Sequence, residues 1–177
     1  MFDHYMTSRT RHTLEERKED LVIAAIAEFA SRGLDAGSSQ AIAAAAGISQ
    51  PYLFKVWKSK SLLFLASLDT VYDRIISVFE KAAEGKPPSV ETLSEVGDEF
   101  ESFSRSEMQM LLQGFAACDH PEVRALVVRR WMELIAVLER IAGRGGDPIK
   151  HFLGVGLLMM VARTADMPES ALLCETQ

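Results

Sequence analysis

The 177-residue chain has few cysteines and no long apolar run. Its two cysteines, Cys118 and Cys174, lie far apart without a C-x-x-C spacing, which argues against a disulfide framework and a zinc cluster. The longest strongly apolar run, residues 152–162, has eleven residues, whereas a bilayer-spanning helix needs about 20. The first residues also lack the apolar core of a secretory signal. We therefore expect a soluble, cytoplasmic protein that holds no metal or cofactor.

Sequence signals of catalysis are missing as well. The four histidines show no H-E-x-x-H or other metal-ligand spacing, and neither G-x-S-x-G nor a phosphate loop ending in G-K-[ST] occurs. The pair Asp119-His120 precedes a predicted helix start, where an aspartate that caps the helix is the simpler explanation. The sequence therefore does not predict an enzyme.

The charge is unevenly distributed along the chain. The formal net charge is −6, which taken alone argues against a nucleic-acid partner, because such proteins need a basic face. Residues 1–60, however, carry eight Lys or Arg against seven Asp or Glu, so that the excess of acidic residues lies in the remainder. Any contact with a polyanion is therefore expected near the N-terminus.

Helical periodicity, capping residues and helix breakers predict an all-α fold. Thr13 and Glu16 form a T-x-x-E capping box, and the helix that begins there ends near Gly33. Serines that can cap the next three helices are Ser38, Ser49 and Ser59. These helices are expected to end near Ala46, near Val56 and before Gly85.

Four more helices are predicted beyond the prolines at 87 and 88. Their expected ranges are 90–103, 107–118, 121–142 and 148–164, and the last two have Asp119 and Asp147 as candidate caps. The range 121–142 is amphipathic, whereas 148–164 is apolar almost all round between Phe152 and Val161. A helix without a polar face must be covered on several sides, and a second subunit is the natural cover.

Two short helices joined by a turn at Gly47 form the helix-turn-helix arrangement, whose second helix normally enters the DNA major groove. Pro51 is compatible with that helix because the first turn has no internal partners for its N–H groups. On a helical wheel, the inward side carries Leu53, Val56 and Trp57. The outward side carries Gln50, Pro51, Phe54 and Lys55.

The outward residues have side chains suited to a groove. The Gln50 amide can pair with adenine, Pro51 and Tyr52 can contact a thymine methyl, and Lys55 can contact phosphate or guanine. Lys60 and the serines at the helix starts lie where free N–H groups favour a phosphate oxygen. The predicted DNA-binding set is Ser38, Ser39, Gln40, Ser49, Gln50, Pro51, Tyr52, Phe54, Lys55 and Lys60.

Residues 17–63 resemble the N-terminal domain of the TetR (tetracycline-repressor-like) transcription regulators. The matching positions are Ala24, Ala25, Phe29, Gly33, Ile42, Ala43, Ala46, Gly47, Ser49, Leu53, Phe54, Trp57, Lys60 and Leu63. Two positions depart from the family pattern. Phe54 stands where a tyrosine usually places its hydroxyl on phosphate, and Gln40 stands where arginine is frequent. Both departures predict weaker anchoring to phosphate, which Tyr52, the nearby lysines or the N-terminal arm can offset.

The resemblance implies three segments and a ligand-controlled regulator. The segments are a flexible arm at 1–12, a helix-turn-helix domain at 13–60, and a helical ligand-binding and dimerisation domain at 61–177. The implied function is that of a homodimeric regulator, usually a repressor, which binds a palindromic operator and is released by a small molecule. A helical dimeric adaptor with a vestigial DNA-binding domain is the alternative.

The same resemblance suggests where ligand and partner subunit bind. The predicted pocket residues are Phe100, Phe103, Met108, Leu111, Phe115 and Trp131. The predicted dimer interface, from the last two long helices, is Trp131, Leu134, Leu138, Phe152, Leu157 and Met160. Gln113 and His151 are candidate polar contacts for the ligand.

Overall fold

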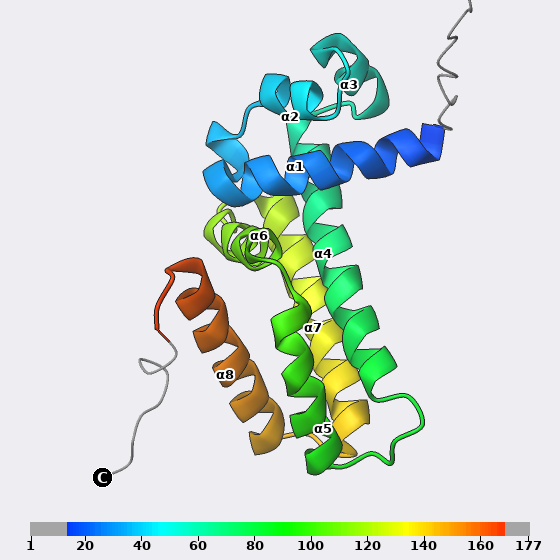
Figure 1. Cartoon of the computed structure of the whole chain (residues 1–177), viewed down its shortest axis with the longest axis vertical. Helices are drawn as coiled ribbons and strands as arrows, with labels where there is room; N and C mark the ends of the chain where they lie inside the picture. The colour runs from blue at the N-terminus through cyan, green and yellow to red at the C-terminus, as the bar shows by residue number, and fades with distance from the viewer. Residues whose placement is uncertain (1–13, 169–177) are drawn as a thin grey trace, which may run out of the picture.

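The computed structural model describes residues 14–168, and every regular element in that range is helical (Figure 1). The α-helices are α1 (Leu14–Ala36), α2 (Ser39–Ala45), α3 (Gln50–Val56), α4 (Lys60–Ala82), α5 (Val90–Gly97), α6 (Arg105–Ala116), α7 (Pro121–Ala142) and α8 (Asp147–Thr164). A short 3-10 helix, η1 (Asp98–Ser102), follows α5. The all-α prediction is confirmed. The arm at 1–12 and the Thr13 cap lie outside the described residues.

Helices α1, α2 and α3 form one end of the molecule, and α4 leads from that end into the rest of it (Figure 1). Helix α4 packs against α1 at one end and along α7 further on, while α6 packs against both α1 and α4. Helix α8 contacts α5, α6 and α7. A continuous set of buried side chains runs from Leu21 in α1 to Met160 in α8, so the two ends of the molecule share one core.

The three predicted serine caps of the N-terminal helices are confirmed. The side-chain oxygens of Ser38, Ser49 and Ser59 each accept a hydrogen bond from the backbone N–H three residues on, at 3.2, 3.4 and 3.1 Å. Gly47, which separates α2 from α3, has a φ of +66°, a conformation that glycine adopts without steric cost. Local capping chemistry therefore sets the boundaries of α2 and α3.

Helix boundaries in the C-terminal part differ from the predicted ones in three places. The segment 90–103 is an α-helix only to Gly97 and continues as η1. Helix α6 begins at Arg105 because Ser104 and Glu107 form a capping box that the sequence reading missed. Neither Asp119 nor Asp147 caps a helix. His120 and Gly146 occupy the cap positions without a side-chain hydrogen bond to the helix.

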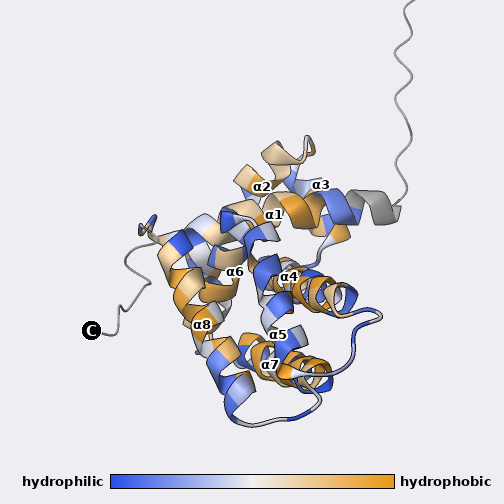
Figure 2. Cartoon of the chain, turned by 60° about the horizontal axis from the view of Figure 1, so that its bottom comes forward, coloured by the Kyte–Doolittle hydropathy of each residue, from blue (hydrophilic) through white to orange (hydrophobic). Residues whose placement is uncertain are grey.

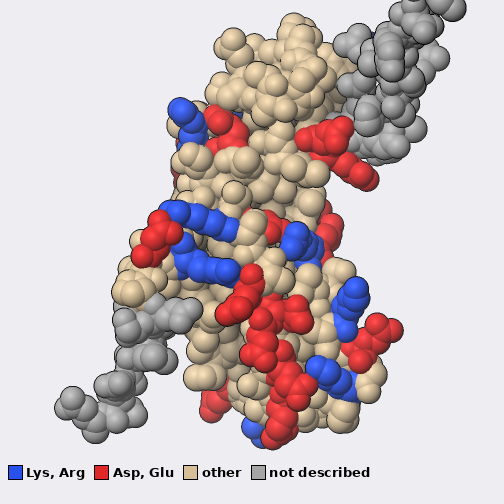
Figure 3. Space-filling model, in the orientation of Figure 1, with Lys and Arg blue, Asp and Glu red and all other residues tan. Residues whose placement is uncertain are grey.

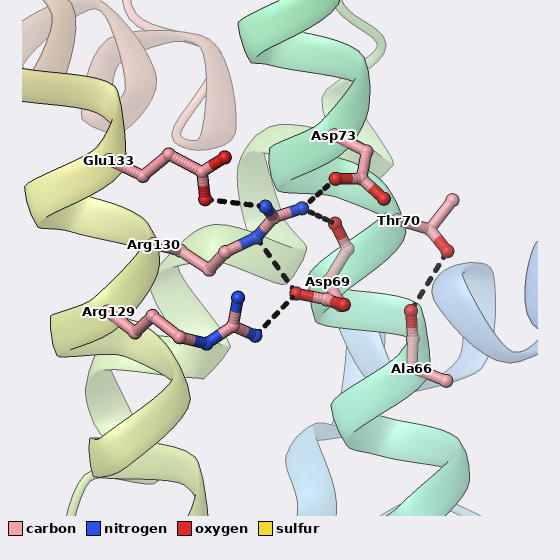
Figure 4. Close-up of polar contacts among 7 residues, drawn as sticks. All are labelled: Ala66, Asp69, Thr70, Asp73, Arg129, Arg130 and Glu133. Atoms are coloured by element: carbon pink, nitrogen blue, oxygen red, sulfur yellow. Dashed lines mark hydrogen bonds and ion pairs between the residues drawn. The ribbon is translucent and has the colours of Figure 1, made fainter. Parts of the chain in front are cut away.

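Helices α4 and α7 are joined by a charged cluster centred on Arg130 (Figure 4). The Arg130 side chain is only 6% exposed, and its Nε lies 2.8 Å from Asp69 Oδ1. Its other guanidinium nitrogens contact the carboxylates of Asp73 and Glu133 and the Asp69 backbone carbonyl. The neighbouring Arg129 contacts Asp69 at 3.1 Å but is 59% exposed. The buried guanidinium therefore ties the middle of α4 to α7.

Tyr72 lies close to this cluster but does not balance its charge. The residue is almost fully buried, and its hydroxyl has no hydrogen-bond partner among the described residues. Burial, with a smaller contribution from nearby Cys118, raises the pKa of Tyr72 to about 12, although Arg130 opposes the shift. Tyr72 is therefore neutral at physiological pH. The charge of Arg130 is balanced by the three carboxylates alone.

The cluster predicts different effects for two neighbouring arginines. Replacing Arg130 by Met should lower the free energy of unfolding by about 1–3 kcal/mol, because three carboxylates lose a cation that is already desolvated. Arg129→Met is the matched control and should change it by less than about 0.5 kcal/mol, because exposed pairs contribute little. Urea denaturation monitored by circular dichroism measures both. If both substitutions lower the free energy of unfolding equally, the burial of Arg130 does not account for the stability that the cluster provides.

Candidate DNA-binding surface and apolar cavity

The outer face of α3 is arranged as its sequence predicts. Leu53 is buried against the core, and Val56 and Trp57 are half-buried. The residues on the opposite side, all of them exposed, are Gln50, Pro51, Phe54 and Lys55. Tyr52 is half-buried between the two sides. The inward and outward sides drawn from the helical wheel are therefore confirmed, whereas contact with DNA stays a prediction.

Helices α2 and α3 are linked at their N-termini through Gln50. Its side-chain Nε2 donates a hydrogen bond to Ser39 Oγ at 2.8 Å, across the turn between the helices. Ser38 also anchors α2, because its backbone N–H donates to Glu28 Oε1 at 2.9 Å. The cap hydroxyls of Ser38 and Ser49 use oxygen as acceptor and keep their hydrogen to donate. Both helix starts therefore retain donors for a phosphate.

The electrostatics around these helices are one-sided. The 33 residues between Asp35 and Asp69 contain three lysines and no carboxylate. Lys55 and Lys58 are exposed, and the exposed side chain of Gln40 lies on α2. This stretch therefore has a local charge of +3 in a chain whose total is −6. No carboxylate of this segment therefore repels a polyanion that binds there.

Lys60 does not have the free ammonium that the sequence reading assigned to it. Its Nζ donates hydrogen bonds to the backbone carbonyls of Asp35 at 2.8 Å and Gly37 at 3.2 Å. Asp35 lies in the last turn of α1, and Gly37 follows that helix where the connection to α2 begins; Gly33 breaks the helical backbone just before them. The observed role of Lys60 is therefore structural: it ties the start of α4 to that connection and has at most one N–H left for phosphate.

A cavity of about 620 Å³ lies on the side of the molecule formed by α5, η1 and α8. Five of the six residues predicted for a pocket line it, namely Phe100, Phe103, Met108, Leu111 and Trp131. His151 lines it too, whereas Gln113 instead contacts the Ala30 carbonyl of α1. Phe115 does not line the cavity but packs edge to face on Trp131, with ring centroids 5.5 Å apart.

The sequence analysis missed the contribution of α5 to this cavity and, apart from His151, that of α8. Further apolar lining residues on these helices include Leu93, Phe152, Leu153 and Met159. The available signal was the apolar character of α8 on nearly all sides, which the sequence reading attributed to a partner subunit. Figure 2 shows hydrophobic residues over much of α8. Part of that surface faces the cavity of its own chain.

Three residues of the predicted dimer interface lie in the core of the chain itself. Leu134, Leu138 and Met160 are buried within the chain, where α7 and α8 pack against the other helices, so they have no surface to offer a partner. Trp131, Phe152 and Leu157 line the cavity. The exposed apolar side chains of α7 and α8 that do not line it are Val128, Met132, Leu158 and Val161.

No helix among the residues that the structure describes is long and apolar enough to cross a membrane. Over the same residues, no three His, Cys, Asp or Glu side chains gather in a way that would hold a metal ion.

A helix-turn-helix with an exposed outer face in a carboxylate-free segment, attached to a helical domain with an apolar cavity, is typical of DNA-binding transcriptional regulators. Residues 21–67 match the family model described as "Bacterial regulatory proteins, tetR family". This segment, about a quarter of the chain, therefore carries a DNA-binding domain of the tetR type.

Two curated relatives each match about half of the chain. The chain is 32% identical over 95 residues to the HTH-type transcriptional activator FasR of Mycolicibacterium smegmatis, a match covering 54% of this chain and 43% of FasR. It is 30% identical over 93 residues to the uncharacterized HTH-type transcriptional regulator YerO of Bacillus subtilis, covering 51% of this chain and 32% of YerO. The matches thus span less than half the length of either relative.

Solved structures share the fold across most of the chain. A TetR-family regulator from Rhodococcus sp. superposes with a TM-score of 0.72 at 15% identity, covering 89% of this chain and 93% of that one. A second, from Mesorhizobium loti, has a TM-score of 0.64 at 19% identity and covers 91% of each chain. At these identities the likeness shows the fold and leaves ligand and operator open.

The Lys60 contacts predict a stability effect that an exposed lysine would not have. Replacing Lys60 by Met should lower the free energy of unfolding by about 1–2 kcal/mol, because two backbone carbonyls lose a charged donor. Lys58→Met, two residues away on an exposed side chain, should change it by less than about 0.5 kcal/mol. Thermal and urea unfolding of both variants measure the difference. A Lys60 variant as stable as the parent would leave phosphate binding as the better explanation for this residue.

Proposed function

We propose that the chain binds a palindromic DNA operator as a homodimer and represses transcription until a small molecule enters the cavity. The observation that carries the proposal is the outer face of α3, which is exposed, polar at both ends and placed in the carboxylate-free segment. A short recognition helix has few contacts, so two copies one helical turn of DNA apart are needed for tight binding.

The DNA-binding set divides by chemistry. Gln50 presents an amide to base edges and Lys55 an ammonium group to a phosphate or a guanine, with Pro51 and Phe54 as apolar neighbours for thymine methyls. Ser38, Ser39, Gln40 and Ser49 lie at the two helix starts, where hydroxyl and backbone donors suit phosphate oxygens. Gln50 has a second role, because its hydrogen bond to Ser39 orients the Gln50 amide before DNA binds.

The proposed dimer uses the exposed apolar side chains of the last two helices. Val128 and Met132 on α7 are 57% and 59% exposed, and they lie one turn apart. Leu158 and Val161 form a similar pair on α8. Two copies that bury these pairs against each other form a four-helix interface and remove apolar surface from water.

The proposed release mechanism follows from helices that reach both the cavity and the DNA-binding end. Helix α4 lines the cavity with Ile75 and Phe79. Its first residue, Lys60, binds the α1–α2 connection. Helix α6 lines it with Met108 and Leu111, and Gln113 contacts the Ala30 carbonyl of α1 at 3.4 Å. A ligand that displaces either helix therefore changes the placement of α3 relative to its copy.

DNA binding is tested by selecting a site from random duplexes and then measuring variants on it. Gln50→Ala should cost about 1–3 kcal/mol on the selected site and relax one base position. Lys55→Ala should weaken selected and random DNA alike and reduce the salt slope by about one if it contacts phosphate. Lys81→Ala, on an exposed lysine at the far end of α4, is the control.

Failure to select any palindromic site would contradict the proposal and favour the adaptor alternative. A reporter gene placed behind the selected site then decides the direction of regulation. Loss of reporter expression when the protein is present supports repression, whereas a gain would make the chain an activator, as FasR is named.

The dimer interface is tested by one charged substitution and its control. Met132→Glu should convert a species of about twice the chain mass into one of 19.6 kDa, because a carboxylate would be buried in an apolar contact. Ile23→Glu makes the same change on α1 at a side chain that is 67% exposed, and the dimer should persist. Analytical ultracentrifugation measures both. A Met132→Glu variant that stays dimeric would place the interface elsewhere.

A further inference from the structure

The charged residues that line the cavity are all acidic, apart from the imidazole of His151. They are Asp98 and Glu101 on η1 and Glu107 on α6. The lining contains no lysine or arginine. The remaining surface is mostly aliphatic and aromatic, so the cavity combines an apolar interior with carboxylates of one sign.

Glu107 is already neutralised by its own chain. Its Oε1 lies 3.0 Å from Arg74 Nε, and its Oε2 accepts hydrogen bonds from the backbone N–H and the hydroxyl of Ser104 at 2.7 Å. Arg74 is held in this position, since it also donates to the Ser102 carbonyl at 3.0 Å. Glu107 and Arg74 therefore contribute no net charge to a ligand.

Asp98 and Glu101 have no such compensation. Neither carboxylate forms an ion pair within the described part of the chain, and both residues are exposed. Arg163 donates to the backbone carbonyls of Phe100, Glu101 and Phe103. It fixes the position of η1 without pairing with a side-chain carboxylate. Figure 3 shows acidic side chains gathered on the face of the molecule that carries α5 and η1.

Four phenylalanines continue from these carboxylates into the cavity. Phe100 contacts Phe103, Phe103 contacts Phe79, and Phe79 contacts Phe152, each edge to face with ring centroids 5.6 to 6.1 Å apart. Aromatic faces attract cations, and the Arg74 guanidinium carbon already lies 5.9 Å from the centre of the Phe103 ring. The rings accept both a flat apolar body and a positive charge near η1.

We propose that the ligand of this cavity is a lipophilic organic cation, with its positive group at Asp98 and Glu101 and its apolar body among the phenylalanines. The inference rests on the proposed function, in which this cavity takes the effector, and adds its chemical class. A volume of about 620 Å³ accommodates a drug-sized molecule. An anionic amphiphile would bury the same apolar surface, but its negative charge would lie beside two unpaired carboxylates.

The test uses three naphthalene probes that differ in charge, each titrated calorimetrically into the full chain. 1-Naphthylmethylammonium should bind at least about tenfold tighter than the neutral 1-naphthalenemethanol, and 1-naphthylacetate should bind weakest. The double variant Asp98→Asn with Glu101→Gln should lose most of that tenfold preference and keep its affinity for the alcohol within about twofold. Glu99→Gln, on an exposed carboxylate of η1 that does not line the cavity, should behave like the parent.

Several results would overturn the proposal: 1-naphthylacetate binding as tightly as the ammonium probe, a double variant with unchanged preference, or no binding of any probe. Unfolding midpoints of the variants, equal to that of the parent, show that the fold is kept. The effector role is read separately, from operator affinity with and without the ammonium probe. A cation that binds through Asp98 and Glu101 without changing operator affinity would confirm the ligand class and contradict the proposed release mechanism.

Discussion

The ion cluster of Arg130 joins the middle of the long helix α4 to α7, and both ends of the molecule pack on α4. Because the guanidinium is buried while its carboxylate partners reach the surface, the pairing is strong enough to fix the helix yet needs no fully buried anion. Asp69 and Asp73 lie near the middle of α4, between Lys60 at its start and Phe79 near its end. Under the proposed function, this contact is the fixed point about which a displacement on the cavity side would turn the opposite end of the same helix.

Under the proposed function, this arrangement explains why a small ligand suffices. Lys60 couples the first turn of α4 to the α1–α2 connection, and Gln50 couples α2 to α3, so the recognition helix follows α4 through two short polar contacts. Helix α6 adds a second route, because Gly33 approaches Gln113 so closely that a Cβ there would lie 2.7 Å from the amide oxygen. Both routes consist of close contacts between packed helices, which transmit a shift instead of absorbing it.

Features set by residues close together in the sequence could be predicted, whereas contacts between residues far apart in the sequence could not. Helix starts at Ser38, Ser49 and Ser59 were predictable because a cap is decided within three residues. The outward side of α3 was predictable from periodicity. The burial of Leu134 and Leu138 inside the chain was not predictable, because an apolar stripe indicates burial without indicating whether its partner is in the same chain. The structural contacts of Lys60 were not predictable because its acceptors lie 23 and 25 residues away.

The uneven charge of the chain serves both proposed binding sites. Residues 61–177 carry a net charge of −7, which disfavours DNA on the C-terminal part, whereas no carboxylate occurs in the segment between Asp35 and Asp69. DNA is thereby directed to α2 and α3 even though the protein as a whole is acidic. The same excess of carboxylates surrounds the mouth of the cavity at η1, so an organic cation is drawn to the end of the molecule from which DNA is excluded. One asymmetry therefore keeps operator and effector from competing for the same surface.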